Sequence, residues 1–279
     1  MDMIANNINP VAFSIGAFEI RWYSLCILAA VIVGYFTINR ECKRFGLRSD
    51  FVFNMMFWAF VVGLLGARVY YVIFNLSAFK GDWLSIFKIW EGGLAIHGGL
   101  IGGLITIILY CKKYKVKPVR MLDFVAPAML ICQAIGRWGN FFNQEAHGPA
   151  TSPDMLRRFF IPDFIIQGMT VEDGVTYTPL FLYESLLCLV AFIIILIIRR
   201  GKYVKIGQPF AFYLLFYGAI RFFIEMGRTD SLMLGGFKMA QVVSVIFFIV
   251  GFCMLAYSSR KNKFEDLYND KTNIDQIRF

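Results

Sequence analysis

Residues 136–148 read GRWGNFFNQEAHG and bring six polar or charged side chains together directly after an almost wholly apolar stretch. Arg137 and Asn140 are three positions apart, so on a helix their side chains lie on the same face. Arginine carries a planar fork of N–H donors that stays charged at any relevant pH and binds phosphate through paired hydrogen bonds. This stretch therefore predicts a phosphate site with Arg137 as the main ligand and Asn140 beside it.

A second polar stripe lies in the segment YGAIRFFIEMGR. Tyr217, Arg221, Glu225 and Arg228 are spaced i, i+4, i+8 and i+11, which places them within an arc of roughly 80° on a helix. Arg221 and Glu225 are expected to pair. The pair could simply hold helices together. Alternatively, Arg221 is a second phosphate ligand that Glu225 and Tyr217 orient.

The segment HGGLIGG begins with His97, whose imidazole can accept a proton near neutral pH. A histidine at the start of a helix is also often a structural hydrogen-bonding residue, and both interpretations stay open. The glycines that follow have small-xxx-small spacing, which favours close packing of another helix over contact with a substrate.

The sequence contains no HExxH motif, no run of aspartates and no Cys/His grouping, so we expect neither a metal site nor a cofactor. No GxSxG motif accompanies the histidine, so the sequence gives little support to a serine hydrolase. All six cysteines are expected to be free packing thiols. The sequence offers positive charge, a possible base and no obvious nucleophile, which suggests that the nucleophile arrives on a second substrate.

The composition indicates the surroundings in which these residues must act. Of the 279 residues, 58% are hydrophobic and only 17% are charged, whereas a soluble domain carries about a quarter charged residues. This predicts an all-α polytopic membrane protein that forms one transmembrane domain over 1–279. The expected spans are 18–38, 51–74, 93–111, 121–138, 180–200, 207–226 and 237–258.

The basic residues indicate how these spans are oriented. Eighteen of the 28 Lys and Arg residues fall in alternate connections and in the C-terminal tail. The positive-inside rule makes these segments cytoplasmic and the N-terminus external, so nucleic acid is not needed as a partner. The long connection at about 141–179 then faces outward as a possible lid or partner-binding surface, and the tail at about 260–279 is expected to be a solvated cytoplasmic extension.

Several charged residues fall within or at the ends of these spans, including Arg21, Arg68 and Glu184. A charge at the centre of a bilayer costs ~2.5–3.5 kcal/mol on insertion scales. Several of these charges are expected near one face of the membrane. They must therefore be paired with opposite charges, be hydrated or take part in function.

These segments together resemble the prolipoprotein diacylglyceryl transferase family. The resemblance extends over essentially the whole chain through RWYSL, the Arg68 region, HGGLIGG, PLFLYES and YGAIRFFIEMGR. The family signature G-R-x-G-N-F-x-N-x-E-x-x-G is met here at Gly136, Arg137, Gly139, Asn140, Phe141, Asn143, Glu145 and Gly148.

The resemblance implies a reaction in a bacterial cell membrane between phosphatidylglycerol and the lipobox cysteine of a prolipoprotein signal peptide. The diacylglyceryl group moves to the cysteine thiol and glycerol 1-phosphate leaves. The missing nucleophile is then the thiol of the substrate.

For this reaction we assign hypothetical roles to individual residues. His97 is the candidate general base, or it positions the headgroup, and Arg137 and Arg221 complete the catalytic set. Glu145 is expected to bind the glycerol hydroxyls or to set the rotamer of an arginine. Further expected substrate-binding residues are Asn143, Gly148, Arg228, Arg68 and Tyr23. Two other functions stay open, a lipid or anion translocator and a phospholipid hydrolase.

Overall fold

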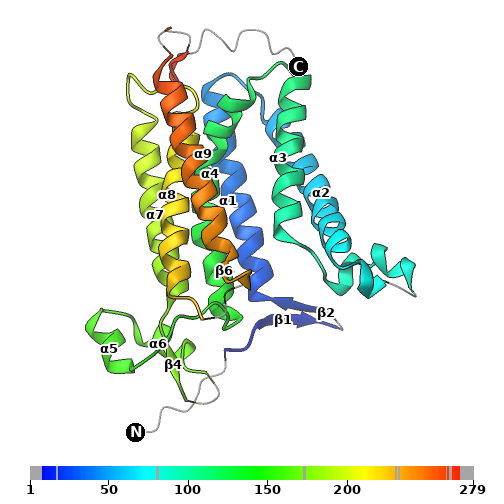
Figure 1. Ribbon diagram of the computed structural model, residues 1–279, viewed down its shortest axis with the longest axis vertical. Coiled ribbons are helices and arrows are strands. Elements are labelled where there is room, and N and C mark those ends of the chain that lie inside the picture. The colour runs from blue at the N-terminus through cyan, green and yellow to red at the C-terminus, as the bar shows by residue number, and fades with distance from the viewer. Residues whose placement is uncertain are drawn as a thin grey trace. The chain divides into compact units, whose positions relative to one another are not determined.

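The computed structural model describes residues 8–270 except 17, 80–81, 172–173, 230, 232, 262 and 264–265 (Figure 1). Seven of its helices are long and apolar enough to cross a membrane, which confirms the predicted architecture. Their lengths of 18 to 26 residues correspond to about 27–39 Å. These helices are α1 (Trp22–Arg44), α2 (Ser49–Phe74), α3 (Ile96–Lys113), α4 (Pro118–Phe142), α7 (Leu180–Ile198), α8 (Gln208–Met226) and α9 (Met239–Ser259).

The start of the first span differs from the sequence-based prediction. Residues Val11–Ile15 form strand β1, which pairs antiparallel with β2 at Phe18–Arg21, and α1 begins only at Trp22. Arg21 therefore lies in a strand opposite Val11 and not inside a helix.

The described chain divides into two compact units, residues 8–37 with 123–270 and residues 38–122. The divisions fall inside α1 and α4, so both helices run from one unit into the other. The two units are described separately below, and a single transmembrane domain over the whole chain stays a prediction.

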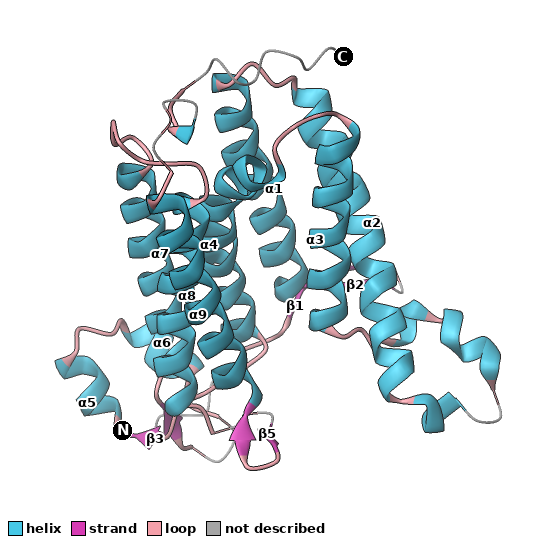
Figure 2. Ribbon diagram, turned by 45° about the horizontal axis from the view of Figure 1, so that its top comes forward, coloured by secondary structure: helices cyan, strands magenta, loops and turns pink. Residues whose placement is uncertain are grey.

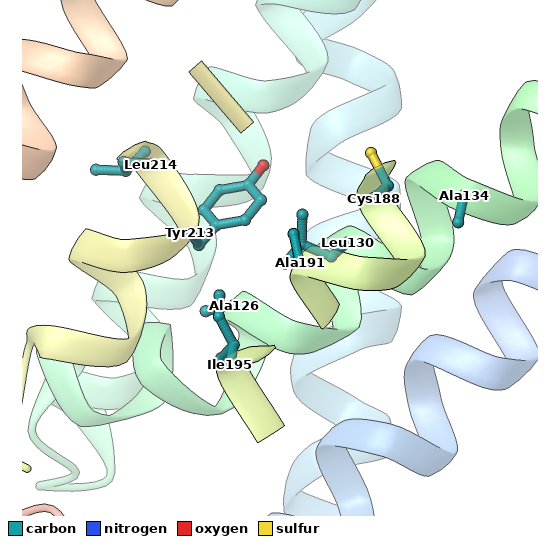
Figure 3. Packing of buried hydrophobic residues seen from close by; sticks show 8 residues of the cluster. All are labelled: Ala126, Leu130, Ala134, Cys188, Ala191, Ile195, Tyr213 and Leu214. Atoms are coloured by element: carbon teal, nitrogen blue, oxygen red, sulfur yellow. The ribbon is translucent and has the colours of Figure 1, made fainter. Parts of the chain in front are cut away.

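The core of the first unit lies between α4, α7 and α8 (Figure 3). Small side chains recur where these helices meet, and they let the backbones approach closely. The buried cluster consists of Ala126, Leu130, Ala134, Cys188, Ala191, Ile195, Tyr213 and Leu214. Ser185 also donates a hydrogen bond of 2.8 Å to the carbonyl of Ala134, which ties α7 to α4.

The connection after α4 in the first unit is folded (Figure 2). It contains β3 (Ala150–Thr151), α5 (Pro153–Arg158), α6 (Asp163–Gly168) and β4 (Thr176–Tyr177). Leu156 and Ile166 bury against Phe141 and Phe181 at the ends of the neighbouring spans. The expected outward segment is therefore a small packed structure with its own core. A further hairpin, β5 (Met233–Leu234) with β6 (Phe237–Lys238), precedes α9.

The tail is not a solvated extension over residues 266–270, so that expectation is wrong for this part. Tyr268 is fully buried, and its ring lies edge-on to Phe124 of α4. The backbone N–H of Ile206 donates to Asp266, and that of Tyr268 donates to Val204. A buried aromatic side chain and backbone pairing with the α7–α8 connection hold the segment in place. Residues 271–279 lie outside the described part of the chain.

In the second unit, α2 and α3 pack through glycines. A side-chain Cβ at Gly66 would lie 2.6 Å from the carbonyl oxygen of Gly98, and one at Gly102 would lie 2.7 Å from that of Val62. No ordinary Cβ contact is this short, so the predicted packing role of the glycines in HGGLIGG is confirmed at Gly98, which the α2 backbone approaches at Gly66, and at Gly102. Between the helices lie three short 3-10 turns at Leu76–Phe79, Trp83–Phe87 and Ile89–Glu91.

Candidate active site

Two arginines from different helices of the first unit share one carboxylate. The Nη2 atom of Arg137 on α4 lies 2.6 Å from Oε1 of Glu184 on α7. The Nη1 atom of Arg221 on α8 lies 3.3 Å from the other oxygen of Glu184. Nη2 of Arg221 lies 2.6 Å from Oε2 of Glu225, which confirms the predicted i, i+4 pair. The result is a chain of alternating charges, Arg137–Glu184–Arg221–Glu225.

These four charges are largely removed from solvent. The Glu184 and Glu225 side chains are 3% and 2% exposed, and those of Arg137 and Arg221 are 20% and 14% exposed. Two positive and two negative groups balance, which limits the cost of burial. Because desolvation cancels much of the attraction in a buried ion pair, such a network is weak evidence for added stability. An expensive polar cluster in an apolar bundle is better explained by function.

The four residues lie near one end of the bundle. Arg137 and Arg221 each lie five residues before the end of their helix, and Glu184 is the fifth residue of α7. At 1.5 Å per residue, these three residues are about 6–8 Å from the ends of their helices. Arg137 and Arg221, both predicted to bind phosphate, therefore lie at the same end of this unit.

Arg137 retains donors that no described residue of the protein uses. Among the described residues only its Nη2 atom has a hydrogen-bond partner, and that atom reaches both Glu184 and, at 3.5 Å, the hydroxyl of Tyr217. Tyr217 was expected to orient Arg221, but the structure places its hydroxyl at Arg137. The ring of Tyr217 stacks on Tyr213, whose hydroxyl accepts a hydrogen bond from Gln133. The partly exposed guanidinium of Arg137 can thus take an additional anion while Glu184 holds one of its edges.

The loop after Arg137 is fixed to the neighbouring helix ends by its backbone. Glu145 N–H donates to the carbonyl of Asn140, and Gly148 N–H donates to that of Thr178, just before α7. A Cβ at Gly148 would lie 2.8 Å from Cβ of Thr178, so this close approach requires a glycine. The side chains of Asn143 and Glu145 are exposed and remain available for other contacts.

Two non-glycine residues in the same loop have left-handed backbone conformations, Gln144 with φ of 50° and Ala146 with φ of 61°. Such conformations cost energy and cluster at functional sites. The carbonyl of His147 accepts hydrogen bonds from the N–H and hydroxyl of Thr229, beyond the end of α8. Hydrogen bonds to Thr178 before α7 and to Thr229 after α8 therefore fix the conformation of the loop.

Two further predicted residues lie in the first unit. The ring of Tyr23 on α1 lies over Gly139, where a Cβ would be 2.7 Å from Cδ2 of the tyrosine. The glycine of the signature therefore makes room for this ring. Arg228 follows α8, and its carbonyl accepts a hydrogen bond of 2.8 Å from Nζ of Lys238, which also binds the carbonyl of Glu225.

Arg68 in the second unit has a structural role, and the geometry does not support its predicted contact with substrate. The side chain is buried, and its guanidinium donates to four backbone carbonyls. These carbonyls belong to Ser85, Ile86, Gly92 and Gly93. Arg68 thus organises the turns between α2 and α3.

His97 is the second residue of α3, also in the second unit. It is exposed, and its ring stacks near that of Tyr70, with ring centres 6.0 Å apart. The imidazole is therefore accessible at the surface.

Sequence analysis predicts a charge at Glu184 within a span but assigns this residue no role. One signal was available, because Glu184 lies in the most apolar of the seven spans, where an acid must have a specific partner. Its partners are 47 and 37 residues away in the chain, so spacing alone could not identify them.

Seven apolar helices and a buried arginine–carboxylate cluster at a helix end define an integral membrane protein whose site suits an anionic substrate. Residues 10–257 match the family model described as prolipoprotein diacylglyceryl transferase. The chain belongs to this family, and it is a transferase that moves a diacylglyceryl group to prolipoproteins.

Several relatives support this assignment over nearly their full length. The chain is 43% identical to the phosphatidylglycerol–prolipoprotein diacylglyceryl transferase of Staphylococcus saprophyticus, over 89% of each chain. It is 44% identical to the enzyme of that name from Staphylococcus haemolyticus, over 95% of this chain and 93% of the relative. For Staphylococcus aureus strain Newman the identity is 42%, over 92% and 91%.

Proposed function

We propose that the chain transfers the diacylglyceryl group of phosphatidylglycerol to the lipobox cysteine at the end of a prolipoprotein signal peptide. The observation that carries the site assignment is the pair of guanidinium groups joined by Glu184, together with the donors of Arg137 that no described residue uses. A phosphodiester is the anion that a lipid brings to the level of the headgroups, and arginine is the side chain that binds it bidentately.

Arg137 binds the phosphate through the guanidinium edge that Glu184 does not occupy. Arg221 is the second ligand, and its two carboxylate partners hold its orientation. Both positive charges also favour the transition state, because the leaving phosphate gains negative charge as it departs. Asn140, Asn143, Glu145 and Gly148 shape the headgroup pocket. Tyr217, Tyr23, Glu225 and Arg228 support it.

In the transfer step, the sulfur of the substrate cysteine attacks the glycerol carbon that bears the phosphate. An S–C bond forms, the C–O bond to phosphorus breaks, and glycerol 1-phosphate leaves with the bonding electrons. The thiol must lose its proton, and His97 is the proposed acceptor because a neutral imidazole is suited to this role near pH 7. Nearby positive charge also favours the thiolate.

The proposed location is the bacterial cell membrane, with the N-terminus and the charged end of α4 and α8 on the outer side. The distribution of basic residues supports this orientation. The signal peptide then meets the lipid headgroup at the outer leaflet.

One assay separates this function from the two alternatives. Purified protein is incubated with phosphatidylglycerol and a lipobox peptide, and the products are followed by mass spectrometry. We expect the peptide to gain one diacylglyceryl unit and glycerol phosphate to appear only when the peptide is present. Release of glycerol phosphate without peptide would indicate a hydrolase, and the absence of any chemical change would favour a translocator.

A further inference from the structure

The turns between α2 and α3 in the second unit present large apolar side chains to the outside. Four of them are between 59% and 77% exposed, namely Trp83, Leu84, Phe87 and Trp90. The 3-10 turn Trp83–Phe87 has no buried residue. A concentration of exposed apolar side chains marks a surface that meets a membrane or a partner. Because tryptophan is enriched where a membrane meets water, the composition of this surface favours lipid.

Hydrogen bonds to α2 show how deep these turns lie. Arg68 donates to the carbonyl of Ser85 over 2.6 Å and to that of Gly92 over 2.7 Å. The backbone N–H of Ala95 donates to the carbonyl of Ala67 over 3.1 Å. Ala67 and Arg68 lie seven and six residues before the last residue of α2, which corresponds to about 9–10 Å along the helix. The turns are therefore bound beside the last two turns of α2, and they extend sideways from it (Figure 1 and Figure 2).

This depth lies within the expected boundary of a membrane. Helix α2 has 26 residues and is about 39 Å long, whereas the hydrocarbon core of a bilayer is about 30 Å thick. A centred α2 extends about 4–5 Å beyond the core at each end, so Arg68 lies about 4–5 Å inside it. Each of the four exposed side chains is within two residues of a carbonyl that Arg68 binds. They therefore lie where headgroups meet acyl chains.

We infer that residues 83–90 form a membrane anchor, whose exposed side chains insert among the bilayer lipids around this end of α2. Lipid cannot pair with backbone carbonyls at this depth, and irregular backbone needs partners from the protein. Arg68 supplies them, which gives a physical reason for a buried arginine so close to an apolar surface. Because the anchor leads into α3, it also sets the depth of His97, two residues after Ala95.

Tryptophan fluorescence tests the anchor without relying on turnover. The full chain is reconstituted in phosphatidylglycerol vesicles with bromine either near the ester groups or near the ends of the acyl chains. Bromine quenches tryptophan on contact, and the difference between the unsubstituted protein and Trp83→Phe or Trp90→Phe isolates each signal. We expect bromine near the ester groups to quench both signals at least about twofold more than bromine near the chain ends, because both rings lie at the headgroup level. Iodide in the water should quench them little.

Trp58 supplies a matched control in the same unit. It is a half-exposed residue of α2, and it lies about 5 Å from the middle of that helix. The signal lost in Trp58→Phe should therefore show the opposite order, with stronger quenching by bromine near the chain ends. If Trp90 followed the order of Trp58, the turns would lie in the hydrocarbon core, and the boundary position would be wrong.

Arg68→Ala tests whether the arginine holds the anchor at this depth. The variant leaves the carbonyls of Ser85 and Gly92 without their donor, so the turns should move toward water to hydrate them. We expect iodide quenching of Trp90 to rise and bromine quenching to fall, while Trp58 on the same helix stays unchanged. Unchanged quenching of Trp90 would reject this role of Arg68.

Two results would overturn the anchor itself. Strong quenching of Trp83 and Trp90 by iodide, with weak quenching by both brominated lipids, would place the turns in water. Loss of bromine quenching when a lipobox peptide is added would show that a peptide, and not lipid, covers this surface. Neither result depends on the transfer activity of the protein.

Discussion

Glu184 determines how the two arginines face one another. Each of its oxygens accepts from a different guanidinium, so a single side chain sets the spacing between Arg137 and Arg221. With Glu225 the network is neutral in the absence of substrate, which makes the buried arginines tolerable in an apolar bundle. In the proposed reaction, an incoming phosphodiester would add one negative charge and bind the donors that remain on Arg137.

Arg137→Lys should lower kcat/KM for diacylglyceryl transfer by roughly tenfold to a hundredfold, because an ammonium group cannot bind Glu184 and phosphate through one planar fork. The lipobox-peptide assay measures the change. The folded helical content should match that of the unsubstituted protein in circular dichroism. Near-normal turnover in this variant would remove Arg137 from the mechanism.

Glu184→Gln should also reduce transfer by about tenfold or more, since a neutral amide offers one acceptor where the carboxylate offers two charged ones. The matched control is Asp154→Asn, which neutralises a solvent-exposed carboxylate that pairs with Arg157 on the surface. Equal turnover of Glu184→Gln and this control would show that Glu184 does not position the arginines.

His97→Gln separates proton transfer from positioning, because glutamine keeps a hydrogen-bonding side chain but cannot accept the proton. If His97 is the base, the rate at neutral pH should fall and should recover partly as the pH rises and the substrate thiol ionises by itself. The pH profile of the peptide assay tests this. Unchanged transfer across the profile would leave the thiol activated by charge alone.

At the residue level, the sequence could predict contacts along one helix but not those between helices. The Arg221–Glu225 pair followed from i, i+4 spacing, and the importance of Arg137 followed from its dense polar surroundings. Glu184 joins helices far apart in the chain, so no local pattern shows its partners. Arg68 looked like an intramembrane ligand, yet its donors face backbone carbonyls whose positions depend on how the turns after α2 fold.

At the level of the helices, substitution can test the close approach of the α2 and α3 backbones. Gly102→Ala would force a Cβ to within 2.7 Å of a backbone carbonyl, so we expect a loss of about 1–3 kcal/mol in unfolding free energy. Gly99→Ala on the same helix meets its nearest atom at 3.6 Å and should change stability little. Denaturant titration in mixed micelles measures both, and equal effects would contradict this explanation.

The packing of residues 266–270 against α4 and the α7–α8 connection can also be tested by substitution. Tyr268→Ala should release residues 266–270, because the fully buried ring is the largest apolar contact that holds them. Hydrogen exchange at the Ile206 amide should then rise sharply. Tyr257→Ala removes a ring that is 71% exposed and should leave this amide protected. Continued protection in Tyr268→Ala would show that hydrogen bonds hold the segment without the ring, namely the backbone pairing and those from the Asn269 side chain to the carbonyls of Arg199 and Gly201.

Seven long apolar runs could be predicted because each span must satisfy its own backbone hydrogen bonds within lipid. The β1–β2 hairpin and the folded segment after α4 could not be predicted from the sequence in this way. Their short elements depend on partners such as Phe141 and Phe181, which come from the ends of spans. The same holds for Tyr268, whose burial needs the surface of α4 and the α7–α8 connection.

For the whole molecule, the basic connections predict a cytoplasmic C-terminus. A fluorescent protein that folds only in the cytoplasm, fused after Phe279, should therefore fluoresce in cells. The same reporter fused in the segment between α4 and α7 should stay dark. Reversed signals would turn the charged end of α4 and α8 toward the cytoplasm and end the proposal that it meets lipid in the outer leaflet.

Asp123 lies near the opposite end of α4 from the arginines. Its carboxylate accepts hydrogen bonds of 2.7 and 3.0 Å from the backbone N–H groups of Gly207 and Phe210, at the start of α8. Helices α4 and α8 run in parallel and are thus joined twice, here and about 21 Å away through Glu184. Neither helix can slide by a turn against the other without breaking both joints. A substitution at Asp123 should therefore disturb lipid chemistry on the far side of the membrane, although it touches no substrate.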